Sequence, residues 1–478
     1  MQIKINLDNH LAGPGGIREM IAIALPMVIS SACETTMTFT DRLFLSRLGP
    51  EYMSAAMAGG LTSFVMMTFV LGLTGYTTAL AAQYWGANQK KRCPVAVTQA
   101  LILSLLAYPV IVAARPLAFW LFDVIKVPSE QLMYQQQYFN ILLNGVLIGL
   151  LRNCLSSFFS GIGKTRVVMV SALTSMAVNV GANYLLIFGK WGIPPLGIRG
   201  AAYGTLIGGF CGLMVLAAVY LGSSVRREYS VAASFRWDSD TMKKLLRFGY
   251  PAGLEFFLNL LAFNLLVMIL HSHSAVTAAA ITIVFNWDMV SFVPMIGINV
   301  GVTSLVGRYM GAGLPDTAHR ATLSGLKLAW MYSSCILLMF AFFPDCLVGL
   351  FRPRHETALF AAAYPMAVTM LRMAALYVMA DAVMLVFGGA LRGAGDTFWA
   401  MCISVVLHWI LVALLFVFVR MWDVPPAASW LTLCCTFMLL SMLFYLRYRQ
   451  GKWRTLRLIG QEFSPPAAVN GFRETKDL

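Results

Sequence analysis

The stretch TALAAQYWGAN, residues 78–88, returns 225 positions later as TSLVGRYMGAG, residues 303–313. Thr, Leu, Tyr, Gly and Ala occupy the same places in both stretches. An apolar chain that repeats a helix ending in this way is predicted to contain two copies of one structural unit. The size of each copy follows from other repeated features.

Two further pairs of features lie at nearly the same spacing. Pro26 and Pro251 are 225 positions apart, and GIGKT at 161–165 returns as GAGDT at 393–397, an offset of 232. The larger offset predicts a small insertion in the second copy, which we place in the outer segment 344–356. The copies then cover residues 1–225 and 244–450, with a cytoplasmic linker at 226–243 and a polar cytoplasmic tail at 451–478.

The composition places both copies in a membrane. Of the 478 residues, 59% are hydrophobic and 12% are charged, whereas soluble domains carry about 25% charged residues. Apolar runs long enough to cross about 30 Å of hydrocarbon recur along the chain, and helices satisfy their backbone polar groups in lipid. We expect twelve helices, near residues 18–46, 54–85, 93–121, 132–160, 166–189, 196–222, 244–271, 275–310, 318–348, 358–391, 397–420 and 425–447.

The expected fold is therefore an all-α polytopic membrane protein whose twelve transmembrane helices form two six-helix bundles. Because six is even, both bundles insert with the same orientation, and a pseudo-two-fold axis along the membrane normal relates them. Such repeats are typical of transporters that rock two bundles around a site near the membrane midplane. A duplicated structural protein would show the same repeat.

The formal net charge of +14 follows the predicted topology. If the N-terminus is cytoplasmic, most basic residues fall in inner loops, which matches the positive-inside rule and places both termini in the cytoplasm. These inner residues include Lys90, Lys91, Arg92, Arg226, Arg227, Arg308, Arg320 and Arg392. The charge therefore indicates membrane topology, and no nucleic-acid partner is expected.

The sequence offers little for enzymatic or metal chemistry. The nine cysteines show no CxxC spacing, so neither a metal site nor disulfides are expected. The GKT at 163–165 lacks the glycine that a phosphate-binding loop has five positions earlier, where Phe158 stands. With no ATPase element and no cofactor, the energy for transport would come from an H⁺ or Na⁺ gradient or from the solute.

Ionisable groups inside the predicted helices carry the functional argument. A carboxylate at the bilayer centre costs about 2.5–3.5 kcal/mol on insertion scales, so it marks a cavity or an ion path. Five carboxylates qualify, namely Glu34, Asp41, Glu255, Asp288 and Asp381.

The spacing of these residues groups them with other polar side chains on shared helix faces. The pairs are Glu34 with Asp41, Asn179 with Asn183, Glu255 with Asn259, and Tyr377 with Asp381. Carboxylate, amide and hydroxyl oxygens together can bind Na⁺, and a desolvated carboxylate can instead take a proton.

Structural interpretations of the same residues stay open. Asp41 precedes Arg42 and could form a surface pair, and Glu34 could form a simple hydrogen bond between helices. Asp288 could lie near the outer end of its helix, where water reaches it. Pro26 and Pro251, in the first helix of each copy, remove a helix hydrogen bond, and they predict either a static kink or a bend that follows ion occupancy.

The ordered motifs resemble the multidrug and toxic compound extrusion (MATE) family over nearly the whole chain. They are ALP…TFTDRLFLSRLG, GANQ with its echo GAGL, FSGIGKT, NVGANYLLIFG…PPLGIRGAAYGT and FGGALRGAGDT. The resemblance implies two six-helix bundles around a V-shaped cleft. It also implies export of amphipathic, often cationic compounds in exchange for H⁺ or Na⁺.

The resemblance also implies roles for particular residues. Asp41 matches the family's ion-linked aspartate and Pro26 its proline, while Asn179, Asn183 and Thr205 match polar positions of the first bundle. An aspartate of the family near Asn183 is an amide here.

In the second bundle, Tyr377 and Asp381 match a Tyr-x-x-x-Asp pattern. Asn259 stands where the family has an acid, and Glu255 lies one turn earlier on the same face. We expect Asp288 and Thr205 to line the substrate cavity.

The sequence leaves several functions possible. A dedicated exporter of one endogenous metabolite and a lipid-linked precursor flippase of the same superfamily are the alternatives, although such flippases usually carry fourteen spans and a basic cavity. An enzyme is not expected, because no paired histidine and aspartate stand at a helix end. Small organic molecules and membrane lipids are the expected partners, and a monomer in the plasma (inner) membrane is the expected form.

Overall fold

The computed structural model describes residues 13–124, 128–192, 194–352 and 358–459, so most of the predicted tail lies outside the described residues. Over these residues the chain is helical and contains no strand. The first half contains α2 (Ile17–Ser46), α3 (Pro50–Gly75), α4 (Thr77–Gly86), η1 (Lys90–Arg92), α5 (Cys93–Ala113), α6 (Arg115–Val124), α7 (Ser129–Asn144), α8 (Val146–Gly161), α9 (Thr165–Phe188) and α10 (Ile198–Leu221).

The linker and the second half follow in the same manner. The predicted linker, residues 226–243, takes in the end of α11 (Ser223–Tyr229), the 3-10 turn η2 (Val231–Ser234) and the first turn of α12 (Ser239–His271). The second half contains α12 (Ser239–His271), α13 (Ala275–Gly311), α14 (Pro315–Phe342), α15 (Pro344–Gly349), α16 (Ala358–Ala394), α17 (Thr397–Arg420), α18 (Pro426–Arg449) and the 3-10 turn η3 (Lys452–Thr455).

The predicted membrane fold is confirmed. Within the described residues, 11 helical segments are long and apolar enough to span a membrane, and the α7–α8 pair, bent by 46°, makes up to 12. Two predicted boundaries were wrong. The span at 93–121 breaks after Ala113, because Pro116 lacks an amide hydrogen and favours the start of a new helix there. The span at 318–348 ends at Phe342, because Pro344 starts α15 in the same way.

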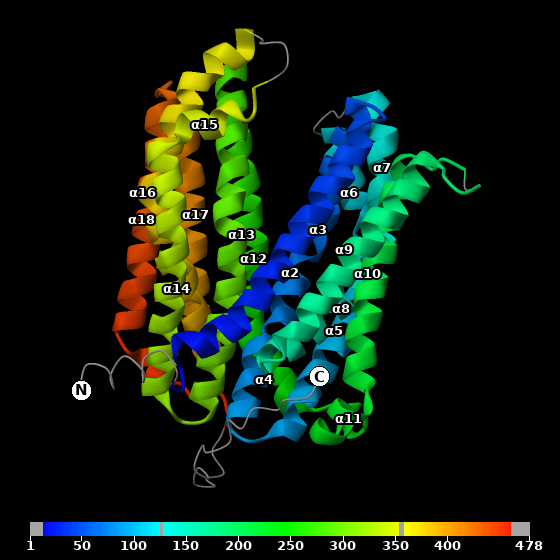
Figure 1. The fold of residues 1–478 in the computed structure, drawn as a ribbon, viewed down its shortest axis with the longest axis vertical. Helices are drawn as coiled ribbons and strands as arrows, with labels where there is room; N and C mark the ends of the chain where they lie inside the picture. The colour runs from blue at the N-terminus through cyan, green and yellow to red at the C-terminus, as the bar shows by residue number, and fades with distance from the viewer. Residues whose placement is uncertain (1–12, 125–127, 193, 353–357, 460–478) are drawn as a thin grey trace.

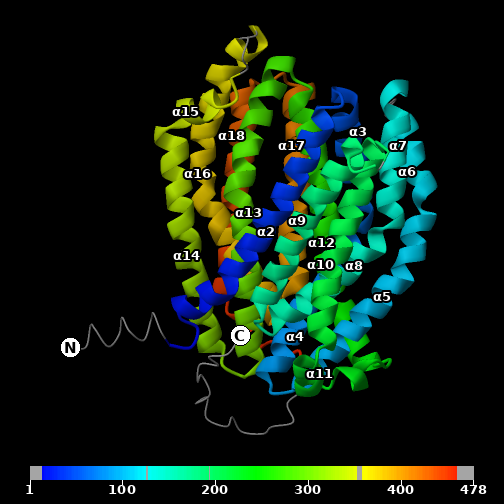
Figure 2. The same ribbon diagram turned by 45° about the vertical axis from the view of Figure 1, so that its right-hand side comes forward.

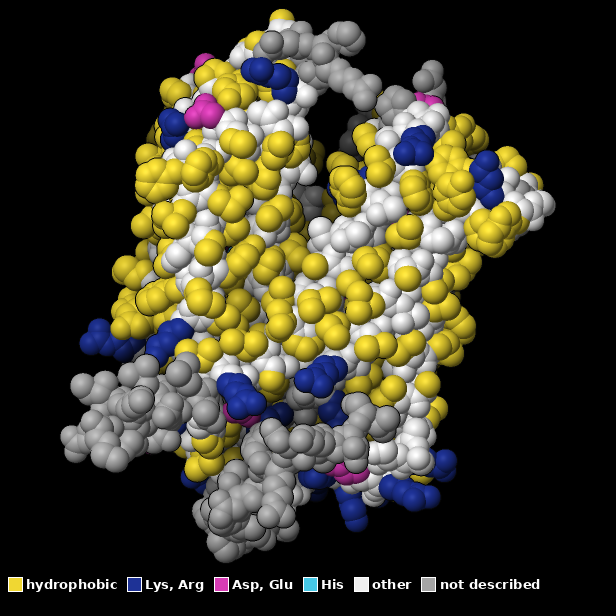
Figure 3. All heavy atoms as spheres, viewed as in Figure 1, with side chains coloured by type: hydrophobic (Ala, Val, Ile, Leu, Met, Phe, Trp, Pro, Cys, Tyr) yellow, Lys and Arg dark blue, Asp and Glu magenta, His cyan; other side chains and the backbone are white. Residues whose placement is uncertain are grey.

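The helices form two bundles that meet at one end of the molecule and part at the other. Figure 1 shows α13 to α18 on one side and α2 to α10 on the other, and Figure 2 shows the same helices turned by 45°. On the face that Figure 3 shows, hydrophobic side chains cover the length of both bundles, and Lys and Arg gather at the end where the bundles meet. This distribution is the one expected for a protein that faces lipid along its sides.

The contacts between helices repeat from one half to the other. In the first half α2 packs on α9, and in the second half α12 packs on α17 in the equivalent way. Each of these leading helices also crosses to the other half, because α2 packs on α13 and α12 packs on α3. The repeated contacts are those expected from a pseudo-two-fold relation between the bundles.

The first turns of α2 belong to the core of the second bundle. Met20, Ile23 and Ala24 are buried in one cluster with Val302 and Val306 of α13. The first helix of each half, α2 or α12, therefore packs against helices of both halves. Movement of one bundle against the other has to involve α2 and α12.

Both repeated prolines lie inside helices that continue through them. Pro26 is buried within α2, and Pro251 is buried within α12. Near Pro251, the glycines of α12 allow a close approach to α3, since a Cβ at Gly253 would lie 2.4 Å from the carbonyl oxygen of Phe69. A bend that depends on ion occupancy stays a prediction for both prolines.

Candidate functional site

The first polar cluster lies inside the first bundle, where α2, α9 and α10 meet. The carboxylate of Asp41 accepts hydrogen bonds from the side-chain amide of Asn183 and, at 3.1 Å, from the hydroxyl of Thr205. Asp41 is 9% exposed, and Asn179 and Asn183 are fully buried. Asn179 lies beside Asp41, but among the described residues neither of its amide atoms has a hydrogen-bond partner.

Small residues on α10 let the amides of α9 reach this position. A Cβ at Gly204 would lie 2.0 Å from the side-chain oxygen of Asn183, and one at Gly208 would lie 2.8 Å from the Cβ of Asn179. The glycine-rich run of α10 therefore brings two amides and a hydroxyl around one carboxylate. The carboxylate of Asp41 and the hydroxyl of Thr205, with the amides of Asn179 and Asn183 beside them, form a polar group that can take a small hard cation or a proton.

Glu34 does not join this cluster, although the sequence spacing predicted a shared helix face with Asp41. Its side chain is 56% exposed and pairs with Arg152 of α8, with 2.6 Å between Nη2 and Oε1. The spacing of seven residues separates Glu34 and Asp41 by about 10 Å along the axis of α2, at about 1.5 Å per residue. The two side chains therefore contact different neighbouring helices.

The second polar cluster lies inside the second bundle, between α13 and α16. The hydroxyl of Tyr377 donates to Asp288 at 2.7 Å. Asp381 lies near enough to interact electrostatically with Asp288, and its Oδ1 is buried with no hydrogen-bond partner among the described residues. Two carboxylates and a phenol therefore share one site.

The structure keeps Tyr377 and Asp381 in one site on α16, as their spacing predicts, and adds a partner from another helix, because the hydroxyl of Tyr377 donates to Asp288 of α13. The position of Asp288 decides an alternative that the sequence left open. Asp288 lies thirteen residues into α13, about 20 Å from its first residue at about 1.5 Å per residue. It therefore belongs to the carboxylate cluster rather than to the outer end of the helix.

A third polar group joins α12 to α16 and α17. Glu255 is buried and pairs with Arg392, with 2.6 Å between Oε1 and Nη2. One turn later, the amide of Asn259 donates to the hydroxyl of Ser404 at 2.7 Å, and Oδ1 of Asn259 is buried without a partner among the described residues. Arg392 was assigned to an inner loop from the sequence, but the structure places it within α16 against a buried acid.

The two repeated helix endings meet each other at the end where the bundles join. Gly86 of α4 faces the backbone of α13, and a Cβ there would lie 1.8 Å from the carbonyl oxygen of Arg308. Gly311 faces α4 in the equivalent way, and a Cβ there would lie 2.1 Å from the carbonyl oxygen of Gln83. The motif that revealed the repeat therefore builds the closest crossing between the two halves.

Side chains of the same motif complete this crossing. Gln83 donates to the carbonyl of Gly393 at 2.8 Å. Arg308, at the matching position of the second copy, donates to the carbonyl of Ile162 at 3.3 Å. Ser304 adds a bond to the carbonyl of Ser160 at 2.7 Å. Each helix ending thus caps a helix of the opposite half.

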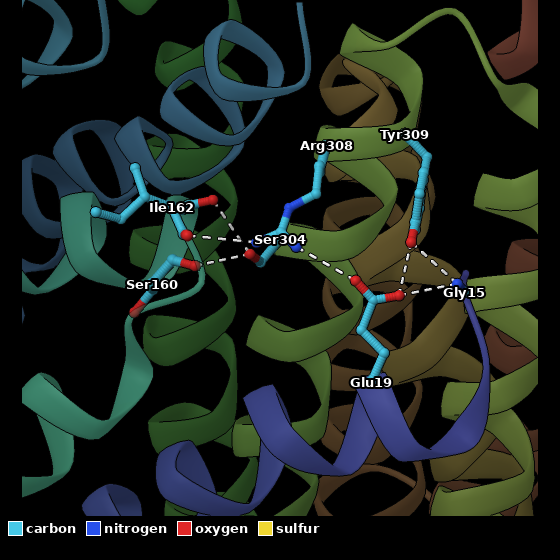
Figure 4. A network of polar contacts seen from close by, with 8 residues as sticks. Gly15, Glu19, Ser160, Ile162, Ser304, Arg308 and Tyr309 are labelled. Atoms are coloured by element: carbon cyan, nitrogen blue, oxygen red, sulfur yellow. Dashed lines mark hydrogen bonds and ion pairs between the residues drawn. The ribbon is translucent and has the colours of Figure 1, made fainter. Parts of the chain in front are cut away.

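Figure 4 shows how Arg308 also ties α2 into this closure. Its Nη1 lies 3.3 Å from Oε1 of Glu19, and Oε2 of Glu19 accepts from the hydroxyl of Tyr309 at 2.6 Å and from the amide of Gly15 at 2.8 Å. The guanidinium also stacks over the ring of Trp85, 4.2 Å from its centroid. Arg308, assigned to an inner loop from the sequence, is 7% exposed. We name residues 15, 19, 83, 86, 162, 304, 308, 309, 311 and 393 the inter-bundle seal.

At the opposite end of the molecule the surface is hollowed between the two bundles (Figure 3). The bundles separate there in Figure 1 as well. The protein is therefore a polytopic membrane protein with two lobes. The lobes meet at one end and part at the other, and each holds buried ionisable groups.

Comparison with known proteins gives the family. The MatE family model matches residues 26–185 and 251–418, at equivalent places in the two halves. Similar proteins include the probable multidrug resistance protein NorM of Thermotoga maritima, 24% identical over 93% of this chain and 95% of that protein. The multidrug resistance protein PmpM of Pseudomonas aeruginosa is 26% identical over 82% of each chain.

Solved structures share the fold. An outward-facing multidrug resistance MATE family transporter of the MOP superfamily superposes with a TM-score of 0.82 at 20% identity, covering 91% of this chain and 95% of that one. A MOP superfamily transporter from Pyrococcus furiosus gives a TM-score of 0.83 at 20% identity, covering 93% and 97%. The chain belongs to the MatE family, so the resemblance found in the sequence is confirmed. The protein is a transporter rather than an enzyme.

Proposed function

We propose that this protein is a secondary active antiporter that exports amphipathic, often cationic organic compounds in exchange for H⁺ or Na⁺. The observation that carries the proposal is the presence of carboxylates in a polar cluster inside each bundle, Asp41 in the first and Asp288 with Asp381 in the second. Carboxylates inside membrane helices are costly, and ion and proton paths are their usual function. The names of NorM and PmpM support export of drugs.

In this proposal the coupling ion and the substrate use the same carboxylates. A cation or proton that binds at Asp41 or at the Asp288–Asp381 pair neutralises negative charge and so weakens attraction for a cationic substrate. At 100 mV, each charge that crosses the membrane supplies about 2.3 kcal/mol, a concentration ratio of about 50. One net positive charge moved inward per cycle is therefore enough to accumulate substrate outside by more than tenfold. Exchange of one monovalent cation for one H⁺ or Na⁺ moves no net charge, so the concentration gradient of the ion then has to drive export.

Alternating access requires the inter-bundle seal to open when the cleft closes. The seal is held by noncovalent contacts. Among them, Arg308, Gln83 and Ser304 donate hydrogen bonds to backbone carbonyls of the opposite half. Each such hydrogen bond contributes about 0.5–1.5 kcal/mol net to the closed form. Binding of an ion or a substrate to the open form can offset free energies of this size. Pro26 and Pro251, in the two helices that cross between halves, are the positions where we expect the helices to bend.

We place the protein in the inner (plasma) membrane with both termini in the cytoplasm. On the face that Figure 3 shows, Lys and Arg gather at the end where the bundles meet, and the positive-inside rule assigns that end to the cytoplasm. The cleft then opens outward. Both polar clusters lie within one chain, so we expect a monomer to suffice.

The test is efflux of a fluorescent organic cation from proteoliposomes under an imposed pH gradient or an imposed Na⁺ gradient. Asp41→Asn and Asp381→Asn are compared with the parent and with Asp423→Asn, a carboxylate that is 93% exposed. Gradient-driven efflux that survives in Asp423→Asn and is lost in one of the other two would identify the coupling bundle. Efflux of equal rate in all four proteins, or none in the folded parent under either gradient, would refute ion-coupled export.

A further inference from the structure

Residues of α14 and α18 line one cavity of the second bundle, and we name the space between these two helices, beside α16, the furrow. Both helices pack against α16, and Phe387 of α16 lines the cavity that the furrow forms at the basic end of the molecule. This cavity has a volume of about 340 Å³, within the range of about 300–1,000 Å³ that small-molecule sites occupy. None of the residues that line it belongs to the polar clusters around Asp41 and Asp288 or to the inter-bundle seal, although Phe387 lies six residues after Asp381 on α16.

The cavity has a rigid aromatic wall. The rings of Phe387 and Tyr448 lie 4.6 Å apart, and Tyr448 stacks on Trp453 of η3 at 4.8 Å with an interplanar angle of 17°. His319 of α14 and the hydroxyl of Tyr448 lie 2.9 Å apart, which joins the two sides of the furrow at its base. Tyr448 and Trp453 are buried, so this wall is fixed before any ligand arrives.

The rim of the cavity is cationic. Arg449, the last residue of α18, and Arg454 of η3 both line it and both are exposed. Arg454 pairs with Asp316 at 3.0 Å, while no hydrogen bond or ion pair holds the guanidinium of Arg449 within the described chain. Two guanidinium groups beside an aromatic wall suit an anion that accepts several hydrogen bonds, as a phosphate does.

The other side of the cavity opens onto the hydrocarbon-facing surface. Leu323 and Tyr445 line the cavity at 38% and 42% exposure, and the same two helices expose Met331 and Met442 farther along. An occupant therefore meets guanidinium groups at one end and apolar side chains at the other. The change from apolar to basic residues at the end of α18 places the cavity at the membrane–water boundary.

We propose that this cavity binds an anionic phospholipid, with its phosphate on Arg449 and Arg454 and an acyl chain along the furrow between α14 and α18. Basic pockets between transmembrane helices on the cytoplasmic side are suited to anionic lipid headgroups. Zwitterionic lipids carry a compensating positive charge, so the two arginines favour lipids with net negative charge.

The test measures binding of phosphatidylglycerol, phosphatidylcholine and inorganic phosphate to the detergent-purified full chain by native mass spectrometry. Each arginine near a membrane surface accounts for about fivefold in affinity for anionic lipid. Arg449→Gln should weaken phosphatidylglycerol binding about fivefold, and Arg449→Gln with Arg454→Gln about thirtyfold. The matched control is Arg226→Gln with Arg227→Gln, two exposed arginines of α11 at the same end.

Selective phosphatidylglycerol binding that the control retains and the double variant loses supports the proposal. Because Arg449 has no partner within the described chain, its single substitution removes charge without breaking an ion pair. Phosphatidylglycerol affinity equal in Arg449→Gln, the double variant and the control would overturn the proposal. So would equal binding of phosphatidylcholine, or occupancy by inorganic phosphate at the concentration at which the lipid binds.

Discussion

Substitution of Gly86 by alanine tests whether the inter-bundle seal sets the balance between the closed and open forms of the inner end. A Cβ at this position would lie 1.8 Å from the backbone oxygen of Arg308, whereas an ordinary contact begins at 3.4 Å. The atom it meets is backbone, so no side-chain rotation relieves the overlap, and α4 and α13 must separate by about 1.6 Å.

Overpacking of this kind typically costs about 1–3 kcal/mol. If the cost falls only on the form with the seal closed, the ratio of closed to open molecules falls by a factor of about 5 to 150. Gly311→Ala should have the same effect, because its Cβ would lie 2.1 Å from the backbone oxygen of Gln83. The matched control is Gly181→Ala in α9, where a Cβ meets nothing within 4 Å.

The assay is a distance measurement by pulsed electron resonance between spin labels at Lys91 and Leu314, which follow α4 and α13 and are exposed. The labels are placed in a background whose exposed cysteines, Cys335, Cys346 and Cys435, are replaced by serine. We expect longer label separations in Gly86→Ala and Gly311→Ala than in the parent or in Gly181→Ala. Distance distributions that coincide in all four proteins would refute the idea that the glycine crossing holds the inner end closed.

Two further predictions concern ion pairs away from the seal. Arg392→Gln leaves the buried Glu255 without its partner, and loss of one partner of a buried pair typically costs about 3–5 kcal/mol of stability. The double variant, Arg392→Gln with Glu255→Gln, should therefore regain part of the lost thermal stability. A double variant no more stable than Arg392→Gln would contradict this. In the linker, burial favours a higher pKa for Glu228, but Lys90 and Lys164 outweigh it and hold the pKa below its ordinary value. The stabilisation is present above the unfolded pKa of about 4.3 and is lost as the pH falls through the lower folded pKa. Glu228→Gln should therefore lower the melting temperature more at pH 7 than at pH 3, and an equal decrease at both would exclude the ion pair as the cause.

The repeated sequence motifs predicted more than the number of helices. The offset of 225 between residues 78–88 and 303–313 predicted equivalent halves, and the structure makes these two stretches contact each other directly. The resemblance also grouped Asp41, Asn183 and Thr205, which the structure brings together. The role of these residues in coupling stays a prediction.

Partners across helices were the features that the sequence could not supply. Helix periodicity placed Tyr377 and Asp381 on one face, but it could not reveal that the hydroxyl of Tyr377 reaches Asp288 on α13. In the same way, Arg308 stands near a helix end in the sequence and was assigned to a loop. Its burial depends on α2 of the opposite half, which brings Glu19 against it.

The sequence by itself determined the membrane class, the two equivalent halves and the helices that carry ionisable groups. These properties depend on composition, on local periodicity and on internal repetition, all of which can be counted along one chain. Only the tertiary structure decided which charge meets which: Glu34 with Arg152, Glu255 with Arg392, and Asp288 with Tyr377. The reason is physical, because helix periodicity fixes the direction of a side chain around its own axis, whereas its partner depends on how separate helices pack and cross.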